Sequence, residues 1–268
     1  MRIPLLLASA VFALQSAPAS AWGPTGHRVT GEIAERNLDA DTKAKIAGIL
    51  GPESIAEASN WPDFMRSDES SFWQDESPNY HYVTIPEGMT YAEVGPPPQG
   101  DAITALAKYT ATVKDANASL AARQEALRFV IHIIEDLHQP LHVGNGRDLG
   151  GNTVKVNFMD EPTNLHSVWD EDIINAELLS YSEWADWLNR RITAEDHIAW
   201  AAAKPAQWLA ESVAIRDGLY PAPSEDPSSS ELPDLSYDYV YAHKPQIDLR
   251  LQQGGIRLAA YLNNLFAE

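Results

Sequence analysis

The strongest constraint on the fold is an apolar stripe at helical spacing in residues 120–137. Its apolar side chains recur three or four residues apart, so they share one helix face that must be buried. They are Leu127, Val130, Ile131, Ile134 and Leu137. Similar patterns and their stop signals predict further helices. These expected helices cover 33–50, 102–116, 165–179, 181–192, 194–215 and 245–266.

Strand signals are few by comparison. His81–Ile85 and Thr153–Phe158 are short, rich in β-branched residues and bounded by Pro or Gly. Loops are expected at Gly95–Gly100 and at the acidic segment Tyr220–Leu235. The sequence has no internal repeat and no linker long enough to divide it. It therefore predicts one all-α, mainly helical domain over residues 22–268, with at most a short β-hairpin.

The first 21 residues have the composition of a processing signal. Arg2 precedes an apolar run from Ile3 to Leu14, and the segment ends in Ala19-Ser20-Ala21. This pattern is typical of a secretory signal peptide that is cleaved after Ala21. No apolar run reaches the roughly 18–20 residues that a membrane span needs. We therefore expect an exported protein, secreted or periplasmic, whose mature chain begins at Trp22.

Composition limits the chemistry that this chain can perform. It has 38 acidic residues, 19 basic residues and no cysteine. The lack of cysteine excludes a disulfide scaffold, a thiol nucleophile and any Cys-based zinc or iron–sulfur site. A net charge of −19 argues against broad binding of phosphate backbones through a basic surface. If the protein handles phosphate, something other than Lys and Arg must supply the positive charge.

Histidine and aspartate recur together at short spacing. His132 and Asp136 lie one turn apart on the predicted helix 120–137, and His166 and Asp170 repeat that spacing in NLHSVWD. Either pair alone would be expected as a hydrogen-bonded core pair, but two pairs beside His142 in HQPLH favour a metal site. Imidazole and carboxylate ligands without sulfur are typical of catalytic rather than structural zinc. HExxH is absent, so a zinc peptidase is not indicated.

The strings around these residues resemble the S1/P1 nuclease family of zinc-dependent single-strand nucleases. The resemblance rests first on HIIEDLHQPLH (132–142), GGNTVKV (150–156) and NLHSVWD (164–170). It extends to WGPTGHR (22–28), NWPDFMR (60–66), HYVTIP (81–86) and the C-terminal segment 242–263. It therefore covers essentially the whole mature chain, with the motifs in the family's order and spacing.

The resemblance implies three Zn²⁺ ions per chain. The first ion would be held by Asp63, His81, His132 and Asp136, and the second by His142, His166 and Asp170. The third would take the amino and carbonyl groups of Trp22, together with His27 and the bridging Asp136. Cleavage after Ala21 would then free an amine that ligates zinc, so the precursor is expected to be inactive.

The resemblance also implies the reaction. A zinc-activated water would attack the phosphorus of single-stranded DNA or RNA and leave a 5′-phosphate, and 3′-nucleotides are expected substrates as well. Asp63 would orient or deprotonate this water, and Arg66 would stabilise charge on the phosphoryl group. Asn152 matches a nucleotide-binding position. Thr84 stands where fungal members have an Asp that contacts the base, so the base preference stays open.

Two other interpretations remain open. A zinc phospholipase C has a similar helical scaffold and an N-terminal Trp ligand, although Asp170 and His27 favour the nuclease. An exported, non-catalytic zinc-binding protein would need neither Asp63 nor Arg66 in its present place. The sequence does not decide between DNA and RNA, nor the pH optimum, and a monomer is the default expectation.

The remaining histidines are expected to have structural roles. His138 lies two residues after Asp136 and so points elsewhere; we expect it to support the site by hydrogen bonding. His197 and His243 match no ligand position and are expected to be ordinary surface or packing residues.

Overall fold

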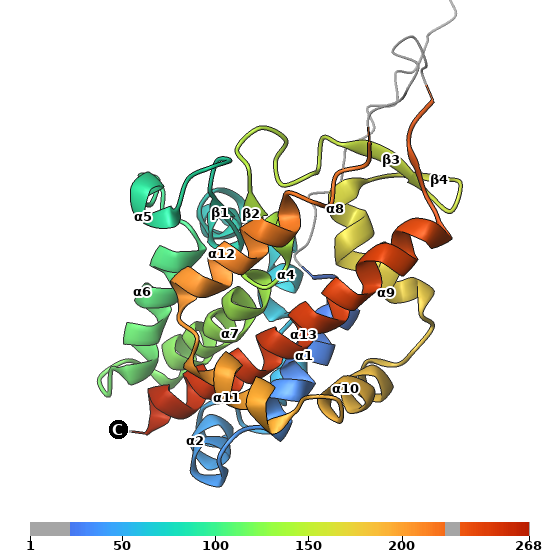
Figure 1. The fold of residues 1–268 in the computed structure, drawn as a ribbon. Helices are drawn as coiled ribbons and strands as arrows, with labels where there is room; N and C mark the ends of the chain where they lie inside the picture. Colours follow the sequence, from blue (N-terminus) through green and yellow to red (C-terminus); the bar gives the residue numbers. More distant parts are fainter. Residues whose placement is uncertain (1–21, 223–230, 268) are drawn as a thin grey trace, which may run out of the picture.

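The computed structural model describes residues 22–222 and 231–267, and most of this part of the chain is helical (Figure 1). The predicted signal peptide and part of the loop 220–235 lie outside the described residues. The longer helices are α1 (Pro24–Arg36), α2 (Ala40–Leu50), α6 (Ala102–Lys114), α7 (Leu120–Asp136), α10 (Tyr181–Asn189), α11 (Ala194–Ala202), α12 (Pro205–Arg216) and α13 (Tyr237–Phe266).

Shorter helical segments connect these helices. Single α-turns are α3 (Ile55–Ala58), α4 (Trp61–Phe64), α5 (Tyr91–Val94), α8 (Leu165–Ser167) and α9 (Ile173–Ala176). The 3₁₀ turns are η1 (Met65–Ser67), η3 (Ser77–His81) and η4 (Pro140–His142), and the π turns are η2 (Phe72–Glu76) and η5 (Val168–Asp172). None of the helices in the described ranges is both long and apolar enough to cross a membrane.

Within the described residues, short strands form two small sheets. β1 (Val83–Thr84) pairs in parallel with β2 (Val143–Gly144). β3 (Lys155–Phe158) and β4 (Glu161–Asn164) form an antiparallel hairpin, and β5 (Asp234–Leu235) joins β3 in parallel. The prediction of a mainly helical fold is confirmed, and two parallel pairings add to the expected hairpin.

Helix α7 is the central element of the core. Ser119 caps it by accepting a hydrogen bond from the backbone of Ala122, and from Ala126 onward all its side chains except Arg128 are buried. One apolar cluster gathers α2, α6, α7 and the end of α13. A second gathers α1, segment 165–188 and the middle of α13, which packs along α1 (Figure 1).

Several predicted helix boundaries are wrong. The helix expected at 33–50 is two helices, because the amide of Asn37 bonds to the carbonyl of Ile33 and to Asn189 and the chain turns there. The helix expected at 194–215 breaks after Ala202, and Pro205 starts α12.

Other predicted ends differ by less. Helix α13 begins at Tyr237 and carries Pro245 inside it rather than at its start. The segment expected at 165–179 ends at Ala176 and includes a π turn, and α10 ends at Asn189. His81 lies in η3 rather than in a strand.

Candidate metal centre

Helix α7 supplies two buried polar side chains to the centre of the site. His132 and Asp136 are buried one turn apart, and Nε2 of His132 lies 3.1 Å from Oδ2 of Asp136. Nδ1 of His132 donates to the carbonyl oxygen of Ser59 at 2.6 Å, which holds the imidazole ring in one orientation.

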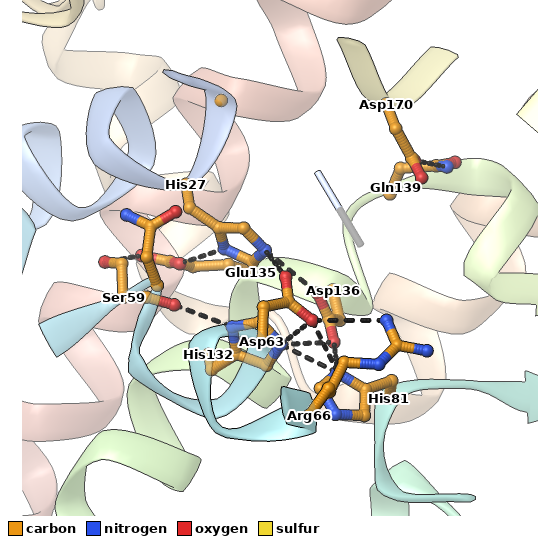
Figure 2. Close-up of polar contacts among 12 residues, drawn as sticks. His27, Ser59, Asp63, Arg66, His81, His132, Glu135, Asp136, Gln139 and Asp170 are labelled. Carbon is orange, nitrogen blue, oxygen red and sulfur yellow. Dashed lines mark hydrogen bonds and ion pairs between the residues drawn. The ribbon is translucent and has the colours of Figure 1, made fainter. Parts of the chain in front are cut away.

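Asp63 on α4 and His81 at the end of η3 face the same point (Figure 2). Nδ1 of His81 lies 3.2 Å from Oδ2 of Asp136 and 2.8 Å from Nε2 of His132. Oδ1 of Asp63 lies 3.7 Å from the same His81 nitrogen and 3.8 Å from Nε2 of His132. The four residues assigned to one ion by resemblance are therefore neighbours in space.

A second group lies beside the first. Ligand atoms of His142, His166 and Asp170 fall within 4.8 Å of one another, and all three residues are buried. Nε2 of His166 lies 2.9 Å from Oδ2 of Asp170, whose other oxygen accepts a hydrogen bond from the Gln139 amide. Nδ1 of His142 lies 3.9 Å from Oδ2 of Asp136, so Asp136 stands between the two groups.

The N-terminal residues of the described chain reach the same place. Nε2 of His27 on α1 lies 3.4 Å from Oδ1 of Asp136 and 3.8 Å from Oδ2 of Asp63. The ring of His27 stacks on that of His132 at 4.3 Å. Trp22 is buried, and the backbone N–H of Gly23 donates to the carbonyl of Asp170 at 2.8 Å. This bond holds the segment that begins at Trp22 against the second group.

Hydrogen bonds orient the histidine rings for metal binding. Nδ1 of His142 donates to the carbonyl of His81, and Nδ1 of His166 to that of Gly150, each at 2.6 Å as in His132. Nδ1 of His27 is bonded to Oε2 of Glu135 at 2.6 Å. In these four rings the other nitrogen, Nε2, is the one left for a metal ion.

Buried atoms without partners fit the presence of cations. Among the described residues, Nε2 of His27, Nε2 of His142 and Oδ1 of Asp136 are buried and have no hydrogen-bond partner. Leaving such atoms unpaired is costly, so they mark places where a ligand belongs. Nitrogen and oxygen donors without sulfur suit zinc in an open, catalytic type of site.

The pKa shifts in the centre also fit the presence of a cation. Burial, reinforced by neighbouring histidines, lowers the pKa of His27, His81 and His142, so these rings favour the neutral form that an imidazole needs to bind a metal. Burial raises the pKa of Asp136 to about 7. Burial acts to lower the pKa of His132, but the charges of Asp136 and Asp63 outweigh it and raise this pKa to about 9. The buried carboxylates thus favour a positive charge beside them, which a divalent cation would supply.

Glu135 is a site residue that the sequence analysis did not single out. It is fully buried on α7, and burial raises its pKa well above the usual range. Its Oε1 accepts from the Ser59 hydroxyl at 2.8 Å and its Oε2 is bonded to His27 (Figure 2). Both oxygens are thus engaged in supporting ligands. Its spacing of three residues from His132 could have revealed it, since the two share one face of α7.

The other predicted site residues lie further out. Nη1 of Arg66 is 3.4 Å from Oδ1 of Asp63, which places the guanidinium at the edge of the first group. Thr84 is exposed on β1, and the Asn152 amide donates to the carbonyl of Leu149 at 2.9 Å.

The expectation that His138 supports the centre is wrong. Its Nδ1 bonds to the carbonyl of Ile134 and its Nε2 to Arg257 of α13, and neither partner is a candidate ligand. His197 is exposed on α11. His243 packs against Tyr239 and Trp169, so both behave as the ordinary residues expected.

Comparison with known proteins identifies the family of the chain. The family model of the S1/P1 nucleases matches residues 22–267. Endonuclease 2 of Arabidopsis thaliana is 32% identical over 288 residues, covering 96% of this chain and 94% of that protein. Nuclease P1 of Penicillium citrinum is 29% identical, covering 91% and 97%, and nuclease S1 of Aspergillus oryzae is 29% identical, covering 90% and 91%. The chain therefore belongs to the S1/P1 nuclease family.

Proposed function

We propose that the protein is an exported, zinc-dependent endonuclease that hydrolyses single-stranded DNA and RNA to 5′-phosphorylated products and also acts on 3′-nucleotides. The observation that carries this proposal is the meeting of His27, Asp63, His81, His132 and Asp136 with a second group, His142, His166 and Asp170, across Asp136. Family membership and relatives that are named endonucleases support the choice of substrate.

Three Zn²⁺ ions are proposed to occupy the centre. Asp63, His81, His132 and Asp136 would hold one, and His142, His166 and Asp170 another. His27 and Asp136 would share the third with the backbone of Trp22, whose amine is free only after cleavage at Ala21. When bound, zinc supplies a Lewis acid that polarises a phosphoryl oxygen and lowers the pKa of water.

The protein's own residues would position the substrate. Arg66 reaches Oδ1 of Asp63, so its guanidinium lies where it can donate to a phosphoryl oxygen next to the ligands. Oδ2 of Asp63 lies 3.8 Å from Nε2 of His27, beyond hydrogen-bond distance, so this oxygen would be able to accept a proton or orient a water.

The burial of the ligands supports a preference for single strands. His81, His142 and His166 are at most 5% exposed, so a phosphate must enter a recess to reach them. A stacked, paired strand cannot bring its backbone into a recess without first releasing a base. A single strand meets this requirement at little cost.

The test uses purified protein that begins at Trp22. Zinc is counted by elemental analysis, and the same sample is assayed on single-stranded DNA, RNA, 3′-AMP and a lipid phosphodiester, with and without chelator. We expect about three zinc ions per chain and chelator-sensitive release of 5′-mononucleotides. Asp136→Asn should abolish turnover, and His197→Ala is the matched control because this histidine is exposed and lies outside the centre.

Other outcomes would refute different parts of the proposal. Three zinc ions with cleavage of only the lipid substrate would indicate a phospholipase. Three zinc ions without any turnover would indicate a zinc-binding protein. One zinc ion or none would contradict the trinuclear centre itself.

A further inference from the structure

A groove of about 470 Å³ lies next to the metal centre. Its walls include Arg28 of α1, Glu53 and Glu57 beside α3, and Trp61, Asp63 and Phe64 of α4. Asp63 belongs both to the groove and to the centre. A molecule in the groove would therefore lie directly beside a phosphate that is bound at the centre.

Phe64 presents an aromatic ring to solvent at this place. It is 75% exposed, although it follows Asp63 directly in the chain. Its neighbour Trp61 is anchored against Trp73 and Phe129 in the core, so α4 is a fixed support. An exposed aromatic ring on a fixed support is the arrangement on which unpaired bases stack.

Arg28 supplies a positive charge in the same groove. Its side chain is partly buried, and the structure gives its guanidinium no hydrogen bond or ion pair with any residue of 22–222 or 231–267. The adjacent carboxylates of Glu53 and Glu57 already bind other groups of the protein. Glu53 binds Arg128 at 2.6 Å, and Glu57 accepts from the backbone N–H of Ser54 at 2.8 Å. In a chain with a net charge of −19, this arginine is available for an anion.

We propose that this groove binds a nucleotide adjacent to the scissile phosphate, with its base stacked on Phe64 and its own phosphate bound by Arg28. The proposal rests on the nuclease function proposed above and names a further contact with the same substrate. It also gives the single-strand preference a second cause, since a base within a duplex is already stacked on its neighbours.

The first test compares Phe64→Ala with the unmodified protein on two substrates. One is a single-stranded tetranucleotide, and the other is methyl p-nitrophenyl phosphate, a phosphodiester without a base. We expect the KM for the tetranucleotide to rise about tenfold, within the range for loss of one stacked base. The ratio of kcat/KM values for the two substrates should shift by the same factor. Phe64→Trp should restore it, and Tyr241→Ala, which removes an 87% exposed ring on α13, is the control.

The second test concerns the charge of Arg28. Arg28→Gln should weaken tetranucleotide binding and reduce the slope of log KM against log salt by about 0.7, the value for one phosphate contact on a single strand. Arg28→Lys should keep most of that slope. Zinc is counted in each variant to check that the substitution has not disturbed His27, the candidate ligand that precedes Arg28 in the chain.

The outcomes separate this proposal from the proposed function. A protein that cleaves neither substrate would refute the nuclease function itself. Normal turnover of both substrates, with unchanged KM in Phe64→Ala and an unchanged salt slope in Arg28→Gln, would refute only the groove. An equal loss on both substrates would show that Phe64 acts on the centre rather than on a neighbouring nucleotide.

Discussion

The carboxylate of Glu135 on α7 is bonded to Nδ1 of His27 on α1 at 2.6 Å, with both side chains fully buried. Glu135 lies between His132 and Asp136 at the C-terminal end of α7. One helix thus supplies two candidate ligands and the support of a third. The centre is therefore coupled to the packing of α1 on α7.

Replacing Glu135 should weaken the metal centre without removing a ligand. In Glu135→Ala, His27 loses the acceptor that sets its tautomer and the Ser59 hydroxyl loses its partner. Loss of such a supporting group typically lowers metal affinity or activity about 10–100-fold. Zinc affinity measured by competition with a chromogenic chelator, together with the nuclease rate, checks this. Glu195→Ala, an exposed carboxylate on α11, is the control, and equal zinc affinity in both variants would contradict the prediction.

Removing the metal should destabilise the fold. The centre then holds buried histidines and carboxylates, and five of their side-chain atoms have no hydrogen-bond partner in the described residues. Because metal binds the folded chain far better than the unfolded one, its removal lowers the unfolding temperature. Calorimetry before and after chelation measures the shift, and zinc added back should restore it. A midpoint that is independent of chelator would show that the centre forms without metal.

Arg216 should hold the two strands that follow the candidate ligands His81 and His142. It is fully buried, and its Nη1 donates to the carbonyls of Ile85 and Val143 at 2.8 and 2.7 Å. Arg216→Met leaves both oxygens without this donor, at a cost of about 2 kcal/mol or more in the free energy of unfolding. Denaturant titration measures the loss.

A neighbouring substitution separates this bond from simple charge pairing. Asp217→Asn removes the exposed partner of Arg216 and leaves both carbonyl bonds in place, so it should cost less than about 1 kcal/mol. Equal losses in the two variants would argue against the strand-holding role.

Tyr109 offers a substitution that should stabilise the protein. Its ring stacks on Phe129 at 4.3 Å, but its buried hydroxyl has no hydrogen-bond partner among the described residues. Tyr109→Phe keeps the stack and removes the unpaired hydroxyl, so the free energy of unfolding should rise by about 1 kcal/mol. Urea titration at neutral pH measures this rise, and a lower value would indicate a partner for the hydroxyl.

The same residue predicts a dependence on pH. Burial raises the pKa of Tyr109 above its usual value near 10, so the folded protein keeps this proton while the unfolded chain loses it. The unfolded state then binds fewer protons, and stability falls as the pH rises above about 10. Tyr109→Phe should show a smaller decline between pH 9 and 11 than the unmodified protein does.

Local patterns predicted much of the fold and many of the candidate ligands. The stripe on α7 placed His132 and Asp136 on one buried face, and the same spacing placed His166 beside Asp170. Periodicity could not predict the break at Asn37, because that break depends on a bond to Asn189, 152 residues away. Nor could local spacing predict that the expected supporting hydrogen bond of His138 goes instead to Arg257 of α13, because that contact is a long-range one.

The sequence by itself determined the helical class and the pairing of His132 with Asp136 and of His166 with Asp170, because these depend on composition and on spacing within single segments. The other candidate ligands followed from the resemblance to the S1/P1 nucleases. Only the tertiary structure decided which nitrogen of each histidine faces the centre. That choice rests on carbonyls of Ser59, His81 and Gly150 in other segments. The support from Glu135 and the groove of Arg28 and Phe64 likewise arise from packing between α1, α4 and α7, since no single segment contains both sides of these contacts.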